Sequence, residues 1–495
     1  MSRNSTFFLF LSVAAVILLI ATACGGAATT AAPTQPPAAT EPPATAAPPT
    51  EALSTVPPLV GDSIRGGLLY DKWWVVIGAD APTGDQPLWQ TQTTNTRTGP
   101  DTWRCKECHG WDYLGKDGRY GSGSHQTGFV GVMGVAGQDP NEILAILQGG
   151  ANPDHDFSTV MDEQALIDLA LFLGDELIDD SAIVNADKTP VGGDASAGDA
   201  IWSDNCAECH GPQGLAVNFS DETGPEYVGT IGADNPWEFL HKARFGQPGE
   251  TMPAGMKLGL SDQDYANLLA YVQSLPTSSP VAEGGRLYDE WWVALGADAP
   301  TGDQPLWQTQ TTNTRTGPDT WRCKECHGWD YLGKDGRYGS GSHQTGFAGV
   351  FAAKDKSADE LTAALTGQVN PDHDFSAVLD ESQINMLVAF VQQGLTDTSA
   401  YINADKTVNG DPAKGKTIYV GTCERCHGEQ GKLINFGDEA GPEYVGTIAA
   451  DNPWEFWHKA SFGQPGEPMP AGVNNGWVPQ DLADLLAYAQ TLPQK

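Results

Sequence analysis

Eight of the nine cysteines in this 495-residue chain lie in four pairs, and each pair has the spacing Cys-x-x-Cys followed directly by a histidine. The four motifs are Cys105, Cys108 and His109; Cys206, Cys209 and His210; Cys323, Cys326 and His327; and Cys423, Cys426 and His427. Two thiols three residues apart lie about one helical turn from each other, with the imidazole beside them. The motifs therefore fix four points around which the chain has to fold.

This spacing predicts four sites of covalent haem attachment of the c type. Each thiol can bond one porphyrin vinyl group, and the adjacent histidine is then held beneath the iron as its proximal ligand. Zinc sites and, in an exported chain, disulfides also use paired cysteines, but neither explains a histidine after every pair. We therefore expect four haem c groups, with His109, His210, His327 and His427 as iron ligands.

The chain is a duplicated pair of two unlike units, A and B. Residues 78–129 recur without change at 296–347, and residues 224–231 recur at 441–448. A repeat this long is a duplicated pair of domains and not a solenoid module. The predicted domains are A1 (59–182), B1 (183–279), A2 (280–398) and B2 (399–495).

The N-terminal segment is typical of an export signal. Residues 7–20 are apolar but too short for a bilayer span of about 20 residues. The run ends in Ala21-Thr-Ala followed by Cys24, which resembles a bacterial lipoprotein signal, although Ala21 stands where such signals usually carry leucine. We expect residues 1–24 to be a signal peptide with lipidation at Cys24; ordinary cleavage and an uncleaved anchor are the alternatives.

Residues 25–58 consist almost entirely of Ala, Thr, Pro, Gly and Glu. Such a segment has too few apolar side chains to offset the entropy of ordering, so it is predicted to be a disordered linker. The expected location is extracytoplasmic, tethered to the outer face of the cytoplasmic membrane or in the periplasm.

Each unit has the same internal order. An amphipathic segment opens it, the Cys-x-x-Cys-His motif follows, and a capped segment of helical periodicity closes it; in B1, Ser261 with Asp264 three residues later caps a helix with one apolar face. This order resembles class I c-type cytochromes, in four copies over residues ~59–495. The resemblance implies a mainly α fold of four cytochrome c-like domains in A-B-A-B order.

In that family a methionine in a Met-Pro context before the last helix commonly binds the iron on the distal side. The pattern matches Met252 and Met469, the expected distal ligands of the two B haems. His241 and His458, each on a predicted helix opened by Asn-Pro, are the competing candidates. A histidine on a helix is more often packed or hydrogen-bonded than a ligand.

The A units have no Met-Pro and carry His155 and His373 at the corresponding place. Residues 133–151 differ strongly from 351–369, yet the seven residues around each of these histidines are identical, which favours bis-histidine haems. His125 and His343 remain alternatives.

The formal charge of −36 argues against binding to nucleic acid or to an anionic membrane surface, both of which require basic patches. A partner guided by electrostatics would present a basic face; alternatively, the acidity only keeps the protein soluble. The resemblance implies other redox proteins as partners.

The function expected from these features is electron transfer, with the bis-histidine A haems at lower potential than the His/Met B haems. The alternatives are a multihaem oxidoreductase that acts on a small inorganic substrate at one open haem, and a cytochrome filament subunit.

Overall fold

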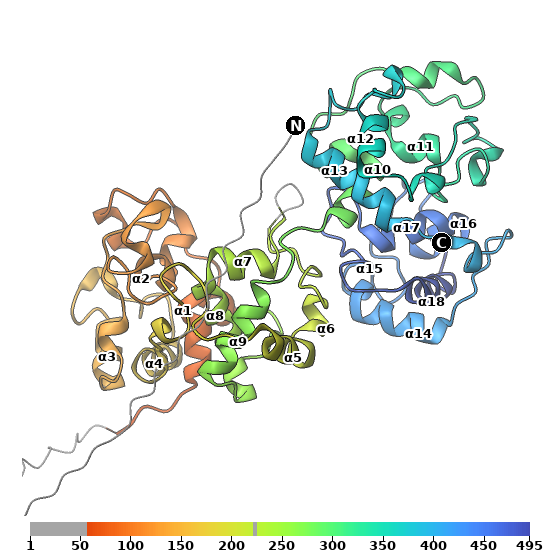
Figure 1. Ribbon diagram of the computed structural model, residues 1–495. Coiled ribbons are helices and arrows are strands. Elements are labelled where there is room, and N and C mark those ends of the chain that lie inside the picture. Colours follow the sequence, from red (N-terminus) through yellow and green to blue (C-terminus); the bar gives the residue numbers. More distant parts are fainter. Residues whose placement is uncertain (1–56, 221–224) are drawn as a thin grey trace, which may run out of the picture. The chain divides into compact units, whose positions relative to one another are not determined.

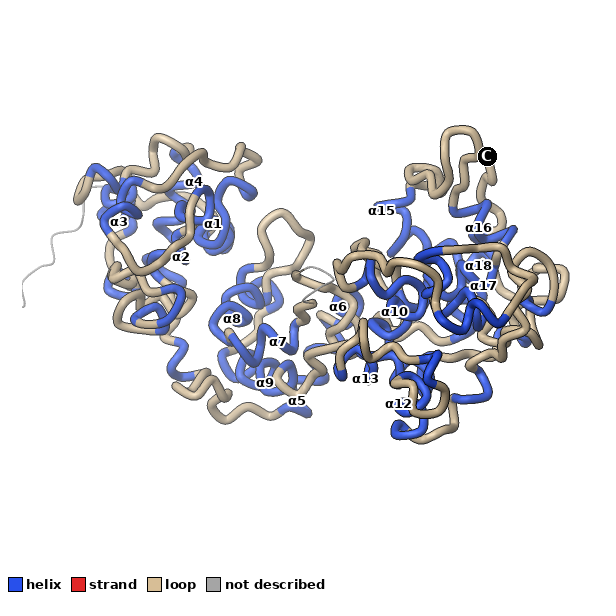
Figure 2. The backbone as a smooth tube through the Cα atoms, turned by 90° about the horizontal axis from the view of Figure 1, so that it is seen from above, coloured by secondary structure: helices blue, strands red, loops and turns tan. Residues whose placement is uncertain are grey.

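The computed structural model describes residues 57–220 and 225–495. Over these residues the chain forms helices joined by long loops, with isolated bridges and no strand (Figures 1 and 2). The predicted signal peptide, the lipidation site at Cys24 and nearly all of the predicted linker lie outside the described residues. Within them, no helix combines the length and apolarity needed to cross a bilayer.

Buried side chains form four separate cores, one for each predicted unit, and this bears out the mainly α, A-B-A-B fold. The helices of A1 are α1 (Ser63–Val76), α2 (Cys105–His109), α3 (Pro140–Leu147) and α4 (Glu163–Leu171). Those of B1 are α5 (Ala195–Asn205), α6 (Ala207–His210), α7 (Val228–Asp234), α8 (Pro236–Phe245) and α9 (Asp262–Val272). Those of A2 are α10 (Pro280–Ala294), α11 (Cys323–His327), α12 (Ala358–Leu365) and α13 (Glu381–Ala389). Those of B2 are α14 (Pro412–Ile418), α15 (Glu424–His427), α16 (Val445–Asp451), α17 (Pro453–Phe462) and α18 (Pro479–Ala489). The exact domain boundaries stay predictions.

The closing helices begin where the sequence predicts. In α9 the Ser261 hydroxyl accepts from the Asp264 backbone N–H while the Asp264 carboxylate accepts from the Ser261 N–H, a complete capping box. Asp162 and Asp380 cap α4 and α13 in the same position. These caps satisfy N–H groups that the helix itself leaves free.

In every unit the opening helix crosses the closing helix at a glycine. The four glycines are Gly66 on α1, Gly198 on α5, Gly284 on α10 and Gly415 on α14. A Cβ atom on any of them would collide with a backbone carbonyl oxygen of the closing helix. The missing side chain therefore lets the two helices approach closely, and this contact closes each unit.

In each half, a side chain of the A unit packs into the core of the B unit, and a side chain of the B unit packs into the core of the A unit. Phe245 of α8 lies in the core of A1, and Trp111, which follows α2, lies in the core of B1. Phe462 and Trp329 do the same between B2 and A2. A1 and B1 therefore form one packed pair, and A2 and B2 form a second.

Candidate haem-binding sites

The motifs of the A units form the short helices α2 and α11. Those of the B units form α6 and α15, with the first cysteine of each motif at the N-cap position. A glycine follows each histidine, with φ of 81°, 78°, 81° and 78° at Gly110, Gly211, Gly328 and Gly428. Side chains other than hydrogen disfavour this backbone region. The glycine thus turns the chain sharply away from the motif.

In every unit an aromatic side chain binds the carbonyl of this glycine; the aromatic residue lies on the opening helix or, in B2, in the turn that continues it. The Tyr70 hydroxyl donates to the Gly110 carbonyl at 2.7 Å. The corresponding donors are Trp202 to Gly211 at 3.2 Å, Tyr288 to Gly328 at 2.7 Å and Tyr419 to Gly428 at 2.7 Å. The motif is therefore fixed against the opening helix directly beside the histidine. We did not predict this contact, although the glycine after all four motifs and an aromatic residue on each opening helix are visible in the sequence.

Domain A1 contains a cavity of about 310 Å³ that brings together Cys105, Cys108, His109 and His155. Its other walls are mostly apolar and include Trp103, Val132, Ile143, Leu147, Phe157 and Leu169. A flat apolar ring with a metal at its centre fits such a lining, because the walls bury its faces and the two imidazoles can reach the metal.

His109 and His155 both line this cavity. Their ring centroids are 6.2 Å apart at an interplanar angle of 76°, and those of His327 and His373 are 6.1 Å apart at 77°. Bonds from imidazole nitrogen to a metal are about 2 Å long, and a ring nitrogen is roughly 1 Å from the ring centre, so two imidazoles on opposite sides of one metal have centroids about 6 Å apart. The spacing in both A domains fits a bis-histidine metal.

Backbone carbonyls orient these rings. Nδ1 of His109 lies 2.7 Å from the Val130 carbonyl oxygen, and Nδ1 of His327 lies 2.7 Å from that of Ala348. A carbonyl oxygen can only accept, so Nδ1 carries the proton and Nε2 keeps its lone pair for a metal. Burial lowers the pKa of both rings to about 4, and these hydrogen bonds oppose the shift only weakly. The rings are therefore neutral, as metal binding requires.

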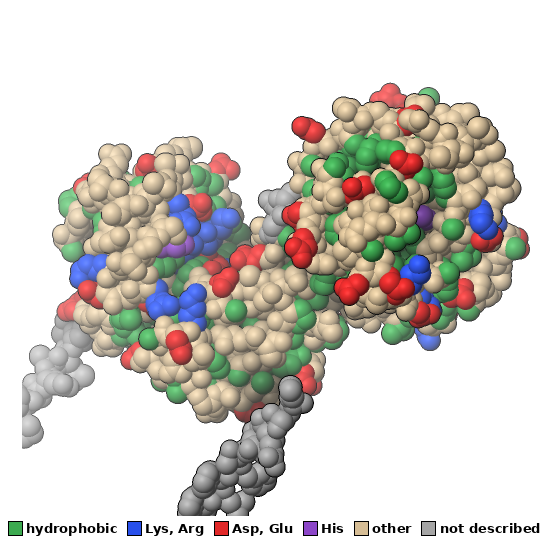
Figure 3. Space-filling view, turned by 45° about the horizontal axis from the view of Figure 1, so that its top comes forward, with side chains coloured by type: hydrophobic (Ala, Val, Ile, Leu, Met, Phe, Trp, Pro, Cys, Tyr) green, Lys and Arg blue, Asp and Glu red, His purple; other side chains and the backbone are tan. Residues whose placement is uncertain are grey.

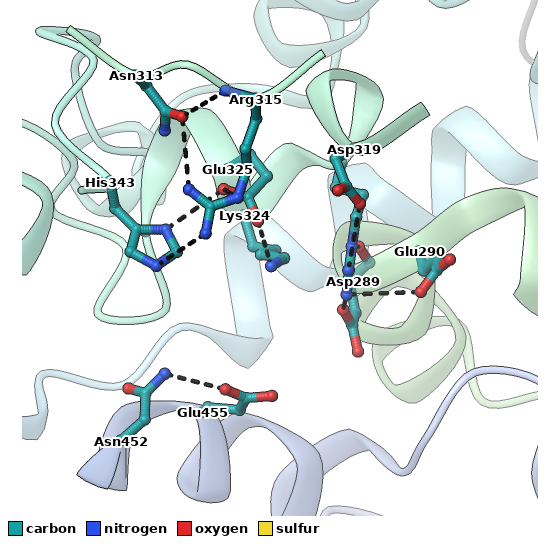
Figure 4. Close-up of polar contacts among 12 residues, drawn as sticks. Asp289, Glu290, Asn313, Arg315, Asp319, Lys324, Glu325, His343, Asn452 and Glu455 are labelled. Atoms are coloured by element: carbon teal, nitrogen blue, oxygen red, sulfur yellow. Dashed lines mark hydrogen bonds and ion pairs between the residues drawn. The ribbon is translucent and has the colours of Figure 1, made fainter. Parts of the chain in front are cut away.

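His125 and His343 lie in a polar cluster outside the cavity. Figure 4 shows His343 beside Arg315 and Glu325, whose atoms lie 3.2 Å and 3.4 Å from its ring nitrogens. Burial opposes ionisation of Glu325, but His343, Lys324 and Arg315 together lower its pKa to about 2. The structure thus places His155 beside His109 and His373 beside His327. His125 and His343 instead contact the glutamate between the two cysteines of each motif, Glu107 and Glu325.

The attachment motifs of the B domains are more open. Cys209 and Cys426 are exposed, and His427 has Phe436 at 5.8 Å between ring centroids. Leu433, Ile434 and Phe436 follow this histidine and are 73%, 41% and 46% exposed. An apolar ring attached to Cys423 and Cys426 would find an apolar surface next to it.

Met252 and Met469 lie on the loops that join α8 to α9 and α17 to α18. Met252 lines a hollow of about 470 Å³ together with Leu68 and Val76 of α1, and the residues of this hollow do not include Cys206, Cys209 or His210. The structure therefore does not bring Met252 to His210 in the way that it brings His155 to His109.

Both ring nitrogens of His241 and of His458 are engaged by groups of the A domain. His241 binds the Tyr113 hydroxyl at 2.7 Å and the Gly67 carbonyl at 2.9 Å, and both histidines are at most 1% exposed. Neither ring has a nitrogen left for a metal in this arrangement.

Disulfides and zinc sites are the other uses of paired cysteines. Among residues 57–220 and 225–495, all eight cysteines are free thiols. The same part of the chain has no cluster of three or more His, Cys, Asp or Glu side chains arranged to hold a metal ion.

Comparison with known proteins gives the class of the chain. A family model described as subunit III of the cbb3-type cytochrome c oxidase matches residues 193–272 and 410–488, within the two B units. Cytochrome c-554(547) of Halothiobacillus neapolitanus is 34% identical over 89 residues, which are 17% of this chain and 98% of that protein. A cytochrome c-553-like protein of Synechocystis is 32% identical over 92 residues, which are 19% of this chain and 79% of that protein.

Reduced recombinant cytochrome c4 from Pseudomonas stutzeri is 23% identical and covers 41% of this chain and 100% of its own, with a TM-score of 0.14, too low to support an argument. Helical units built around Cys-x-x-Cys-His are those of c-type cytochromes. The chain belongs to the cytochrome c family, as a multidomain class I c-type cytochrome. Members of this family carry covalently bound haem c and exchange electrons with other redox proteins.

Proposed function

We propose that this protein is a tetrahaem electron-transfer cytochrome, with one haem c in each of its four units. Support comes from the repetition of the same local arrangement: motif helix, glycine turn and aromatic donor occur in all four units. Haem counting by mass spectrometry of the mature chain tests the number. A colourless protein, or fewer than four covalently bound porphyrins, would contradict it.

The A haems have two histidine ligands in this proposal, His109 with His155 and His327 with His373. The distance of about 6 Å between the centroids of these rings in both A domains is the observation that carries it. Two imidazoles give a lower potential than a histidine and a methionine, so the A haems form the low-potential pair.

The B haems have His210 with Met252 and His427 with Met469 as ligands. The Met-Pro position before the closing helix supports this choice, and the occupied nitrogens of His241 and His458 speak against these histidines. Replacement of Met252 or Met469 by alanine should each remove one His/Met spectrum out of two. Unchanged spectra would reject the methionines.

Each A unit has a second histidine beside the proximal one, which favours electron transfer over catalysis at an open iron. Exogenous ligands give the experiment: the proposal expects slow and incomplete binding of cyanide and carbon monoxide by the purified protein. Rapid binding at one haem would instead indicate a haem enzyme.

The protein is extracytoplasmic, as is typical of cytochromes c, and tethered to the membrane through Cys24 or an uncleaved anchor. Acidic side chains are spread over the visible face in Figure 3, which suits redox partners with a basic docking face. Mass spectrometry of the mature N-terminus tests the lipid, and the dependence of partner reduction rates on ionic strength tests the charge.

A further inference from the structure

Helix α8 of domain B1 packs against domain A1, and His241 lies in the contact. Its ring is 1% exposed and binds two groups of A1, the Tyr113 hydroxyl at Nδ1 and the Gly67 carbonyl of α1 at Nε2. Lys242, the next residue, binds Asp71 of α1 at 2.8 Å. The helix is thereby held to A1 by side-chain contacts at consecutive positions.

The chemistry of the partners fixes the proton on the His241 ring. The Gly67 carbonyl can only accept, so Nε2 carries the hydrogen and donates it. The neutral ring then accepts the Tyr113 hydroxyl hydrogen at Nδ1. Burial lowers the pKa of His241 to about 3, so this neutral, doubly bonded form is the one present at neutral pH.

On the A1 side, these contacts reach the segment that carries the proximal histidine. Trp111 comes two residues after His109, and its ring centroid is 5.1 Å from that of His241. Tyr70, which holds the Gly110 carbonyl, has its ring centroid 5.6 Å from His241. A shift of α8 would therefore act directly on the turn behind His109.

On the B1 side, α8 is part of the core that holds the other attachment motif. Leu240, next to His241, is fully buried in the same core as Trp202. Trp202 donates to the Gly211 carbonyl, which follows His210. One packed helix thus connects the two motifs of the first half.

The second half repeats this arrangement. His458 lies 2.8 Å from the Tyr331 hydroxyl and 3.0 Å from the Gly285 carbonyl, and its ring centroid is 5.0 Å from that of Trp329. Other positions of the contact differ: Arg244 corresponds to Ser461 and Leu68 to Arg286. Both halves thus have the histidine and its two hydrogen bonds, although these neighbouring residues differ between the halves.

We propose that His241 and His458 are positioning residues for electron transfer between the A and B haems of the same half. One electron leaves the ferrous iron of the A domain, which becomes ferric, and reduces the ferric iron of the B domain, which becomes ferrous. No proton moves, because the imidazole stays neutral throughout. This inference rests on the proposed function, which supplies the two haems and their different potentials.

The test compares the full four-haem chain with His241→Phe, His458→Phe and the double variant. Phenylalanine keeps an aromatic ring near Trp111 but removes both hydrogen bonds. A limiting amount of a one-electron reductant is generated by a light flash. Electron transfer from the A to the B haems is then followed by absorbance at wavelengths where bis-histidine and His/Met haems differ. The rate of electron tunnelling falls exponentially with the distance between the two irons, so a shift of α8 that separates the motifs should slow the transfer.

Each single variant should slow half of the transfer amplitude and leave the other half at the native rate. The double variant should slow all of it. Native rates over the full amplitude in the double variant would overturn the inference, as would slowing of the whole amplitude in a single variant.

Haem content and static spectra of every sample separate the two proposals. Four equivalent haems would contradict the assignment of A and B ligands, whereas two spectral classes with unchanged kinetics contradict only the positioning role. If His241→Phe fails to load four haems, Tyr113→Phe, which removes one hydroxyl, carries the same test with the same two outcomes.

Discussion

The imidazole rings of His327 and His373 have their centroids 6.1 Å apart, at an interplanar angle of 77°. Nδ1 of His373 lies 2.9 Å from the Ala364 carbonyl oxygen and Nδ1 of His327 lies 2.7 Å from that of Ala348. Both rings are thus oriented by backbone groups of their own domain, and both have Nε2 free. The protein fold itself sets up this pair.

Replacement of His155 by alanine should convert one A haem to a high-spin or weakly ligated form, because its sixth ligand is lost while its covalent attachment remains. Electron paramagnetic resonance of the ferric protein should show about a quarter of the iron affected if four haems are present. His125→Ala is the matched control from the same domain and should leave the spectrum unchanged. If His125→Ala changed the spectrum and His155→Ala did not, His125 would be the ligand.

Gly415→Ala should destabilise domain B2, because the new Cβ would collide with the Asp484 carbonyl where α14 crosses α18. Overpacking of this kind costs about 1–3 kcal/mol. Gly421→Ala, in the same domain, meets open space and has no positive φ, so it should be close to neutral. Calorimetric unfolding of both variants measures the difference, and equal melting temperatures would show that the crossing can adjust.

Acid should weaken the pairing of the A and B domains. Burial lowers the pKa of His241 to about 3 and that of His458 to about 4, whereas in the unfolded chain a histidine titrates near pH ~6.5. The unfolded state therefore binds these protons first, so the stabilisation is complete above pH ~6.5 and declines as the pH falls towards these values.

The free energy of unfolding, measured by denaturant titration, should decrease as the pH is lowered from 7 to 5. Most carboxylates remain ionised in this range. The variant with phenylalanine at both His241 and His458 lacks the two groups and should show a shallower dependence. Equal slopes in the two proteins would assign the effect to other groups.

One buried ion pair of the first half, Arg244 with Asp180, has no counterpart at the corresponding residues of the second half. Arg244 binds Asp180 at 2.7 Å, and the corresponding residues in the second half are Ser461 and Thr398, which are also buried. Asp180→Ala should cost about 3–5 kcal/mol, because it leaves the arginine charge buried and unpaired. The double change Asp180→Thr with Arg244→Ser copies the second half and should be much less harmful. Urea unfolding compares the two, and an equal loss in both would show that the pair is a net source of stability.

The sequence was sufficient for the parts of the fold that depend on local chemistry. The Cys-x-x-Cys-His spacing predicts the attachment motifs, and the cap formed by Ser261 and Asp264 predicts the start of α9, which the structure confirms. The internal repeat predicts the A-B-A-B order. These features are readable because each depends on residues close together in the chain.

The contacts between domains were not readable in the same way. His241 and Tyr113 are 128 residues apart, and nothing in the periodicity of α8 shows which of its faces meets another domain. Sequence reasoning left His241 open as an iron ligand because a polar ring on a helix can serve either purpose. Only the tertiary packing assigns both of its nitrogens to A1.

The apolar cavity around His109 has a consequence for biogenesis. If domain A1 holds a haem, as we propose, a chain that lacks it would have a cavity of about 310 Å³ in this domain, comparable to a severe large-to-small core mutation. Such a chain should unfold locally and be degraded by proteases. Cofactor supply would then set how much of this protein accumulates.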